Sequence, residues 1–153
     1  MKKILLAVDD TKGSKAAVNF SNFVCKCLNP DTVLLCYIEE YEGRSLMTAN
    51  LPMSELSTLK EVLKGTDYKK KLDEKADAII GFYRKTLEAN GIKGIKPVVR
   101  MGHPAEEILR LAKEEGAEMI VMGSRGKRVS HRFMGSVSRE IANNAEVPVL
   151  IVK

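Results

Sequence analysis

The chain has 153 residues, of which 44% are hydrophobic and 29% are charged. A chain of this length and composition predicts one globular domain with a single core, which needs neither disulfides nor a structural metal to fold. The net charge of +5 permits anionic partners without identifying them. Because basic and acidic residues are interspersed along most of the chain, nucleic acid is not an expected partner.

The first forty residues predict two strands joined by a helix. A continuous apolar run at Ile4–Val8 predicts a buried strand, and apolar residues at helical spacing within Ser14–Leu28 predict a helix. A second apolar run at Thr32–Ile38 predicts a strand parallel to the first, with both faces covered. No apolar stretch approaches the roughly 20 residues that a membrane helix requires. We therefore expect a cytoplasmic protein.

The segment of about 39–70 is polar and is interrupted by glycine and proline, which predicts a variable insert with one short helix near Ser54–Leu63. After it, helices and strands alternate again. They are predicted as a helix with apolar residues from 72 to 87, a strand at Lys96–Arg100, a helix from Pro104, a strand at Glu118–Met122, a helix from Ser136 and a strand at Val147–Val152. This alternation predicts a single α/β domain over residues 1–153, with a parallel sheet between helices.

Two loops leave the carboxyl ends of predicted strands, where open parallel sheets bind their ligands. The first is Asp9–Ser14 and the second is Gly123–Gly135. Glycines at 123 and 126 allow the backbone to approach a ligand closely, and the helix that opens at Gly135–Ser138 offers free amides and a dipole that favour an anion. The sequence thus indicates a phosphate site, although glycines also serve in ordinary connections between strands and helices.

A cluster of basic residues lies within the second loop and contains no carboxylate. Its members are Arg125, Lys127, Arg128, His131 and Arg132. Positive charge at this place would favour a triphosphate over a monophosphate. The alternative is a solvated basic loop with no ligand.

Four motifs occur in a characteristic order along nearly the whole chain. They are the opening KKILLAVDD, the turn GHPAEEI, the segment VMGSRG followed by MGSVS, and the ending VPVLIVK. Together they resemble the universal stress protein family. The resemblance implies a Rossmann-like, three-layer α/β/α fold with five parallel strands in the order 3-2-1-4-5, and a homodimer paired through the last strand at 147–152. In one branch of the family it also implies an ATP or AMP site, with Mg²⁺ held through the phosphates.

Carried over by position, the nucleotide site implied by this resemblance lies at the ends of three strands and around the second loop. Its residues are Ala7, Val8, Asp9, Tyr37, Met122, Gly123, Arg125, Gly126, Gly135, Ser136, Val137 and Ser138. In the family pattern the glycines and Ser136 bind phosphate. The strand end at Asp9 holds adenine and ribose, and the backbone at Tyr37 contacts the base.

Two departures from the family pattern fall within this site. Eight residues, 127–134, separate Gly126 from Gly135, one fewer than in the pattern. Asp10 stands where the pattern has glycine and adds a second carboxylate. The alternative interpretation is therefore a dimeric interaction module of the same fold that does not bind nucleotide.

Other functions fit the sequence less well. Asp9 with Asp10 also suggests a receiver domain, but no apolar run within 39–70 ends in the acceptor aspartate that such a domain needs. A P-loop is excluded because Gly126-Lys127 is followed by Arg128 and not by serine or threonine. No arrangement of nucleophile, base and orienting group is evident. Catalysis is therefore not indicated. The family resemblance implies a nucleotide-binding regulatory protein of the stress response, with at most weak ATPase activity.

Overall fold

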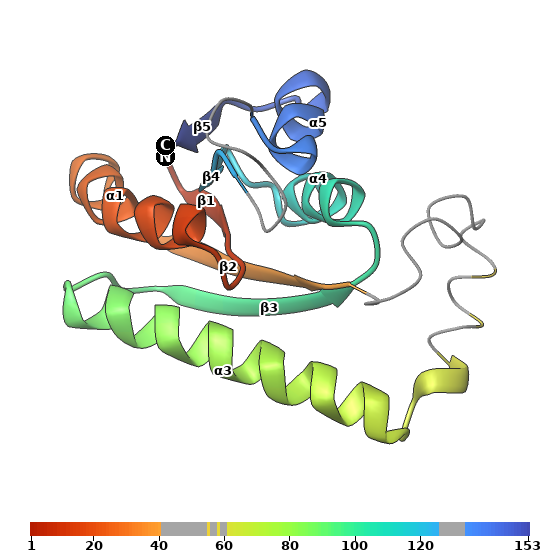
Figure 1. Cartoon of the computed structure of the whole chain (residues 1–153). Coiled ribbons are helices and arrows are strands. Elements are labelled where there is room, and N and C mark those ends of the chain that lie inside the picture. Colours follow the sequence, from red (N-terminus) through yellow and green to blue (C-terminus); the bar gives the residue numbers. More distant parts are fainter. Residues whose placement is uncertain (41–54, 56–57, 59–60, 126–133) are drawn as a thin grey trace.

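Strands and helices alternate along the chain in the computed structural model, which describes residues 1–40, 55, 58, 61–125 and 134–153 (Figure 1). The elements are β1 (Lys3–Ala7), α1 (Lys12–Leu28), β2 (Thr32–Glu39), α3 (Asp67–Ala89), β3 (Ile95–Met101), α4 (Pro104–Glu115), β4 (Met119–Gly123), α5 (Ser136–Asn144) and β5 (Val149–Val152). Within the described residues, no helix combines the length and apolarity needed to cross a bilayer.

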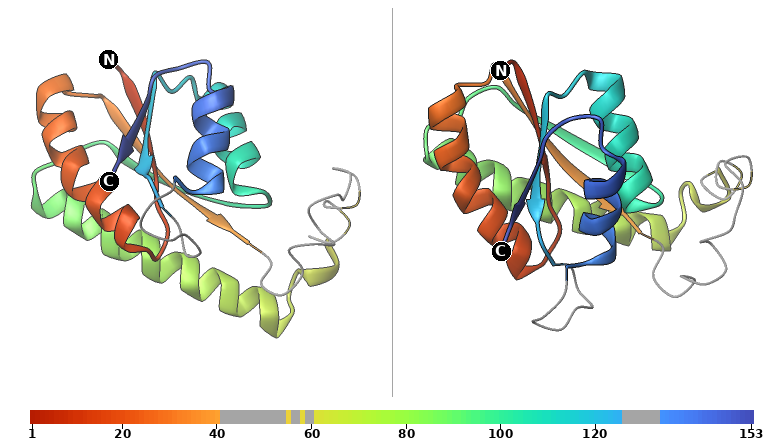
Figure 2. Two further views of the ribbon diagram at one scale, coloured as in Figure 1. Left: turned by 45° about the horizontal axis from the view of Figure 1, so that its top comes forward. Right: turned by 90° about the horizontal axis from the view of Figure 1, so that it is seen from above.

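The five strands form one sheet in the order β3-β2-β1-β4-β5, and every neighbouring pair is parallel. The α/β class and the strand order expected from the family resemblance are both confirmed. In the register of the sheet, Ile4 of β1 lies between Val33 of β2 and Met119 of β4. Because the strands are parallel, the carboxyl ends of β1, β2 and β4 open at the same edge of the sheet, seen from two sides in Figure 2.

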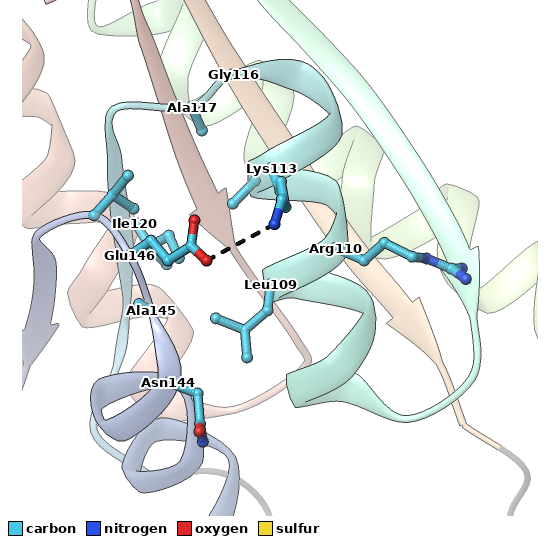
Figure 3. Close-up of a pocket in the computed structure, with 11 residues that line it drawn as sticks. Leu109, Arg110, Lys113, Gly116, Ala117, Ile120, Asn144, Ala145 and Glu146 are labelled. Atoms are coloured by element: carbon cyan, nitrogen blue, oxygen red, sulfur yellow. Dashed lines mark ion pairs between the residues drawn. The ribbon is translucent and has the colours of Figure 1, made fainter.

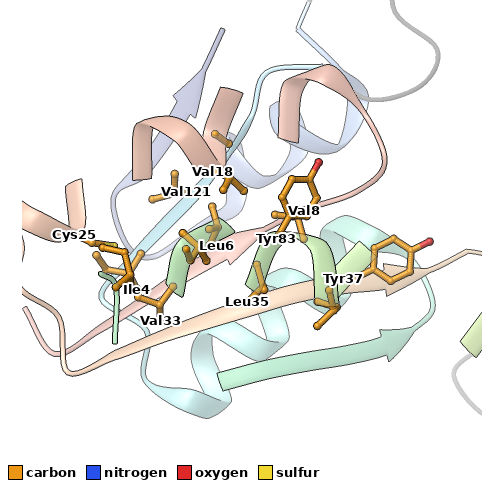
Figure 4. Close-up of a cluster of buried hydrophobic side chains, with 14 of the residues drawn as sticks. Ile4, Leu6, Val8, Val18, Cys25, Val33, Leu35, Tyr37, Tyr83 and Val121 are labelled. Carbon is orange, nitrogen blue, oxygen red and sulfur yellow. The ribbon is translucent and has the colours of Figure 1, made fainter. Parts of the chain in front are cut away.

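Helices cover both faces of the sheet, which explains why β1 and β2 are apolar without alternation. On one face, Ile4, Leu6 and Val8 pack with residues of α1 and α3 (Figure 4). On the other face, Leu5 and Ala7 pack with residues of α4 and α5. A fully buried aliphatic side chain contributes about 2 kcal/mol through the hydrophobic effect. The central strand β1 is therefore held from both sides and gives the site a rigid base.

Two helices begin before their predicted limits. The prediction relied on the spacing of apolar residues, and the capping residue and first turn of a helix lie outside that spacing. Helix α1 begins at Lys12, two residues before the predicted start, and Thr11 caps it. Helix α3 begins at Asp67 after the capping residue Thr66, well before its first apolar position, Leu72. Of the short helix predicted at Ser54–Leu63, residues 55, 58 and 61–63 are helical and the others lie outside the described residues.

A partly buried ion pair joins the two chain segments that flank the predicted insert. Glu39 ends β2 with a side chain that is only 2% exposed, and its Oε2 lies 2.9 Å from Nζ of Lys69 in the first turns of α3. Lys69 also pairs with Asp73 on the same helix. The other oxygen, Oε1 of Glu39, has no hydrogen-bond partner among the described residues. Desolvation by burial therefore raises the pKa of Glu39 above its ordinary value of 4.5, despite the bond to Lys69.

This raised pKa has a consequence for stability that unfolding experiments can detect. Between pH 4.5 and the raised pKa of Glu39, the native state binds more protons than the unfolded state, so stability falls as pH rises. Glu39→Gln removes that fall. We therefore expect the stability of this variant relative to wild type to rise with pH when urea unfolding is measured from below pH 4.5 to neutrality.

Asp73 provides a control whose effect on stability changes with pH in the opposite direction. The hydrogen bond that it accepts from Lys69 lowers the pKa of Asp73 below the ordinary value of 3.8. The stability contributed by Asp73 is present above pH 3.8 and is lost as pH falls below it. Asp73→Asn should therefore weaken the protein at neutral pH and not at acidic pH. If both variants differ from wild type by an amount independent of pH, the proposed titration of this cluster is wrong.

Candidate nucleotide-binding site

The two loops predicted to face one crevice are in backbone contact at the carboxyl end of the sheet. A Cβ built on Gly123, the last residue of β4, would lie 2.5 Å from the carbonyl carbon of Gly13. A Cβ built on Gly13 would lie 2.5 Å from the carbonyl oxygen of Arg125. Contacts this short leave no room for a side chain at either position, so the two glycines allow the loop after β1 and the loop after β4 to meet.

The side chain of Asp9 organises the loop that follows β1. Its Oδ1 accepts hydrogen bonds from the Thr11 amide at 2.9 Å, from the Thr11 hydroxyl and from the Ser14 hydroxyl at 2.6 Å. The Ser14 hydroxyl oxygen in turn accepts the Asp9 amide proton at 2.8 Å. The hydroxyl of Tyr83 on α3 donates to the Asp9 carbonyl at 3.1 Å. Asp9 thus joins β1, the start of α1 and α3 into one hydrogen-bonded unit.

The loop between β4 and α5 is closed at its base by a group of residues that we call the neck: Ser124, Gly135 and Ser138. The Gly135 amide donates to the Ser124 carbonyl at 2.8 Å. The Ser138 hydroxyl lies 3.0 Å from that carbonyl and 3.0 Å from the carbonyl of Gly135, and can donate its one proton to either. The Ser124 amide donates to the Val152 carbonyl of β5 at 2.7 Å. The neck therefore fixes both ends of the loop against the edge of the sheet.

The amino end of α5 is open to a ligand in a way that the other described helices are not. Its N-cap residue is Gly135, which supplies no side-chain cap, and its first turn contains no acid. By contrast, Thr11 caps α1, Thr66 caps α3, and α4 carries two glutamates in its first turn. The first amides of a helix and its dipole favour an anion. Among the described helices, α5 alone presents these amides with neither a cap nor an acid.

The predicted site residues divide into those that offer side chains and those that offer only backbone. Ala7, Val8, Tyr37 and Met122 are at most 7% exposed, and their side chains belong to the two hydrophobic cores. Figure 4 shows the side chains of Val8 and Tyr37 among the residues of one core. Burial raises the pKa of the Tyr37 hydroxyl, which therefore remains protonated at neutral pH. These residues can contribute mainly backbone groups to a ligand.

The remaining predicted residues lie around the neck or beyond the described part of the chain. Ser136 is exposed at the start of α5, whereas Ser138 is buried and uses its hydroxyl within the neck. Arg125 and Val137 are partly buried. Gly126 and the basic residues Lys127, Arg128, His131 and Arg132 lie outside the described residues.

The predicted loop Asp9–Ser14 includes Thr11, Gly13 and Ser14, but the sequence analysis gave none of the three a role. Tyr83 was not identified as part of this region. Thr11 carries a recognisable signal, because a threonine before a helical pattern is a common N-cap. Gly13 follows within the first turn of α1, where a glycine is unfavourable for helix formation and indicates a packing requirement. Tyr83 fits the apolar stripe of α3 and gives no sign in the sequence that its hydroxyl reaches the Asp9 carbonyl.

A pocket of about 490 Å³ lies at the opposite end of the strands, between α4 and α5 (Figure 3). Leu109 of α4, Ile120 of β4 and Ala145 after α5 are among the residues that line it. The ion pair between Lys113 and Glu146, 3.8 Å apart, links its two sides, and both side chains are nearly four-fifths exposed. None of the predicted site residues lines this pocket. It is therefore separate from the candidate nucleotide site.

Comparison with known proteins agrees with this architecture. The model of the universal stress protein family matches residues 1–153. Universal stress protein MJ0577 of Methanocaldococcus jannaschii is 31% identical over 99% of this chain and 94% of its own length. A solved structure of MJ0577 superposes with a TM-score of 0.76, at 29% identity, over 99% of this chain and 95% of that chain.

Two more distant structures share the fold, and each is of a protein with an adenine nucleotide bound. A universal stress protein in complex with cAMP has a TM-score of 0.69 at 22% identity, over 99% of this chain and 97% of that chain. A family protein from Arabidopsis thaliana with AMP bound has a TM-score of 0.63 at 14% identity, over 100% of this chain and 92% of that chain. The match to the family model over the whole chain is decisive. The chain belongs to the universal stress protein family.

Proposed function

We propose that this protein binds an adenine nucleotide in the crevice between the loop after β1 and the neck. The observation that carries the proposal is the uncapped amino end of α5, which lies next to the backbone contact between Gly13 and Gly123. This arrangement provides amide donors for phosphate oxygens and a surface that a ligand can approach closely. The family relatives that contain cAMP and AMP support adenine as the base.

Each part of the proposed site has a distinct task. The amides at Ser136–Ser138 and the exposed Ser136 hydroxyl would bind phosphate oxygens. The side chain of Asp9 would face the ribose, because its Oδ1 is committed to Thr11 and Ser14 while Oδ2 makes no hydrogen bond within the described part of the chain. The backbone at Tyr37 would contact adenine. The positive charge of Arg125 and the residues that follow it favours ATP over AMP.

Mg²⁺ fits this site as a companion of ATP. No cluster of three or more histidine, cysteine or acidic side chains able to hold a metal is found among the described residues. The ion would therefore be held through the phosphates, where it neutralises their charge. The protein would act as a regulatory protein of the stress response whose state depends on nucleotide occupancy.

The proposal also includes a homodimer paired through β5. Among the described strands β5 pairs with β4 alone, and its four aliphatic residues are all only partly buried. An apolar edge strand of this kind is a ready template for pairing with another strand. The second candidate function, an interaction module without nucleotide, would use the same pairing. Nucleotide binding is therefore what distinguishes the two candidates.

Titration calorimetry on protein freed of bound ligand tests the proposal with ATP, AMP and cAMP. We expect saturable binding of at least one of them. We also expect a rise in melting temperature, because a ligand at 100 times its dissociation constant stabilises the native state by about 2.7 kcal/mol. A mass spectrum of material released from the purified protein by denaturation should contain the same nucleotide. If none of the three produces heat or changes the melting temperature, the nucleotide proposal is wrong and the interaction module is the candidate that remains.

A further inference from the structure

One flank of α1 carries an uncharged, largely apolar stripe. The stripe, which we call the aromatic flank, consists of Gly13, Ala16, Phe20, Phe23 and Cys27. Spacings of three and four residues place these positions on one side of the helix. Phe20 is 43% exposed and Phe23 is 62% exposed, with their ring centroids 5.9 Å apart. Two neighbouring phenylalanines exposed to this degree mark a candidate contact surface.

The aromatic flank faces the β5 side of the domain. Gly13 is the first residue of the aromatic flank and lies against the Arg125 carbonyl. The residue before Arg125, Ser124, is hydrogen-bonded to Val152 of β5. Helix α1 packs chiefly on β4 and also touches β5, and the views in Figure 2 place α1 beside β5. The exposed rings therefore lie on the same side of the molecule as the unpaired edge of the sheet.

The two edges of the sheet differ in a way that indicates which edge a partner uses. The edge strand β3 carries Lys96, Pro97 and Arg100, and charged residues and proline are known to discourage strand pairing. The other edge strand, β5, is aliphatic throughout. On the α1 face of β5, Leu150 and Val152 remain only partly buried although they pack against the core.

We infer that the aromatic flank packs against the same flank of a second copy of the chain and covers the junction of two paired β5 strands. This inference rests on the β5 pairing included in the proposed function. If two β5 strands pair, the two β4 strands lie three strand spacings apart, or about 14 Å. Helices in direct contact lie about 8–10 Å apart. The two α1 helices, each over its own β4, would therefore leave a gap that only large side chains can close.

The charge distribution is compatible with a second copy at this surface. The chain carries a net charge of +5, so two copies repel each other overall. The aromatic flank has no charged residue, whereas the opposite flank of α1 carries Lys15, Asn19, Asn22 and Lys26. Two aromatic flanks can meet without bringing like charges together. Phe20 and Phe23 fill the gap over Leu150 and Val152 and exclude water from the strand junction.

Sedimentation velocity over a range of protein concentrations tests this inference with the double variant Phe20→Ser/Phe23→Ser. We expect its dimer dissociation constant to rise on the order of 100-fold, because buried aromatic anchors dominate interface energetics. Phe82→Ser is the matched control. Phe82 is 57% exposed on α3, a helix that covers β2 and β3, so its loss should leave the dissociation constant unchanged.

The outcomes separate this inference from the β5 pairing. If the double variant dimerises as tightly as wild type while Ile151→Pro, which removes an amide on the side of β5 away from β4, abolishes the dimer, the aromatic flank has no role and the pairing stands. If wild type remains monomeric at every concentration, both are wrong. If Phe82→Ser weakens the dimer as much as the double variant, the effect is not specific to the flank and the inference is wrong. Should the double variant fail to fold, Phe23→Ser replaces it, because Phe23 is the more exposed of the two.

Discussion

Gly123→Ala should reduce both the stability of the protein and its affinity for nucleotide. The added methyl would lie 2.5 Å from the Gly13 carbonyl carbon and 2.6 Å from its oxygen. These are backbone atoms at the start of α1 and cannot move aside as a side chain can, so the two loops must separate. We expect the free energy of unfolding to fall by about 3 kcal/mol. Nucleotide affinity should fall on the order of 100-fold, which corresponds to about 2.7 kcal/mol.

Gly81→Ala is the matched control, because it adds the same methyl to a position with open space. Nothing lies within 4 Å of a Cβ built on Gly81, which is in the interior of α3. Alanine is favoured over glycine inside a helix by about 0.5–1 kcal/mol, so this variant should be slightly stabilised. Urea unfolding and calorimetry measure both variants. If Gly123→Ala unfolds and binds nucleotide as wild type does, the two loops do not depend on this close contact.

Asp9→Ala should give the second large effect, even without a ligand. The substitution removes the oxygen that accepts three hydrogen bonds, two from Thr11 and one from Ser14. Ser14 is only 4% exposed, so its hydroxyl would lose an acceptor where water has little access. Hydrogen bonds to a charged group contribute about 1.5–3 kcal/mol, and we expect a loss of about that size. Thermal unfolding of the ligand-free protein measures it.

Asp9→Asn separates the structural task of Asp9 from its proposed contact with the ligand. Asparagine keeps an oxygen at the Oδ1 position and replaces Oδ2 with an amide group. We expect this variant to retain most of its stability but to bind nucleotide more weakly than wild type. Equal losses of stability in the two variants would show that the charge of Asp9, and not its hydrogen-bonding pattern, supports the loop. Wild-type affinity in Asp9→Asn would place Oδ2 outside the ligand contact.

Much of the fold could be predicted because the sequence signals for it are local. The apolar runs at Ile4–Val8 and Thr32–Ile38 correspond to β1 and β2, since strands covered on both faces need no polar alternation. The strand predicted at Glu118–Met122 corresponds to β4, which extends one residue further to Gly123, and the helix predicted from Ser136 is α5. The strand order came from the resemblance to the family, because periodicity does not determine which strands are neighbours.

The direction of individual hydrogen bonds could not be predicted. Ser138 belongs to the predicted nucleotide site, and nothing in the sequence indicates that its hydroxyl is oriented toward the Ser124 and Gly135 carbonyls. The contact of Tyr83 with Asp9 joins residues 74 positions apart in the sequence. Such contacts depend on how α3 and α5 pack against the sheet, and that packing is a property of the whole fold.

The loop after β4 has one residue fewer than the family pattern, and the neck gives a reason why this difference need not disturb the fold. The Gly135 amide bonds to the Ser124 carbonyl at 2.8 Å, and this contact places α5 relative to β4 whatever the number of residues between them. The cost of closing a loop changes by only a few tenths of a kcal/mol when its length changes by one residue. A change of one residue between Ser124 and Gly135 is therefore expected to be close to neutral for stability. If the protein binds nucleotide as proposed, selection on the length of this loop would act through binding more than through folding.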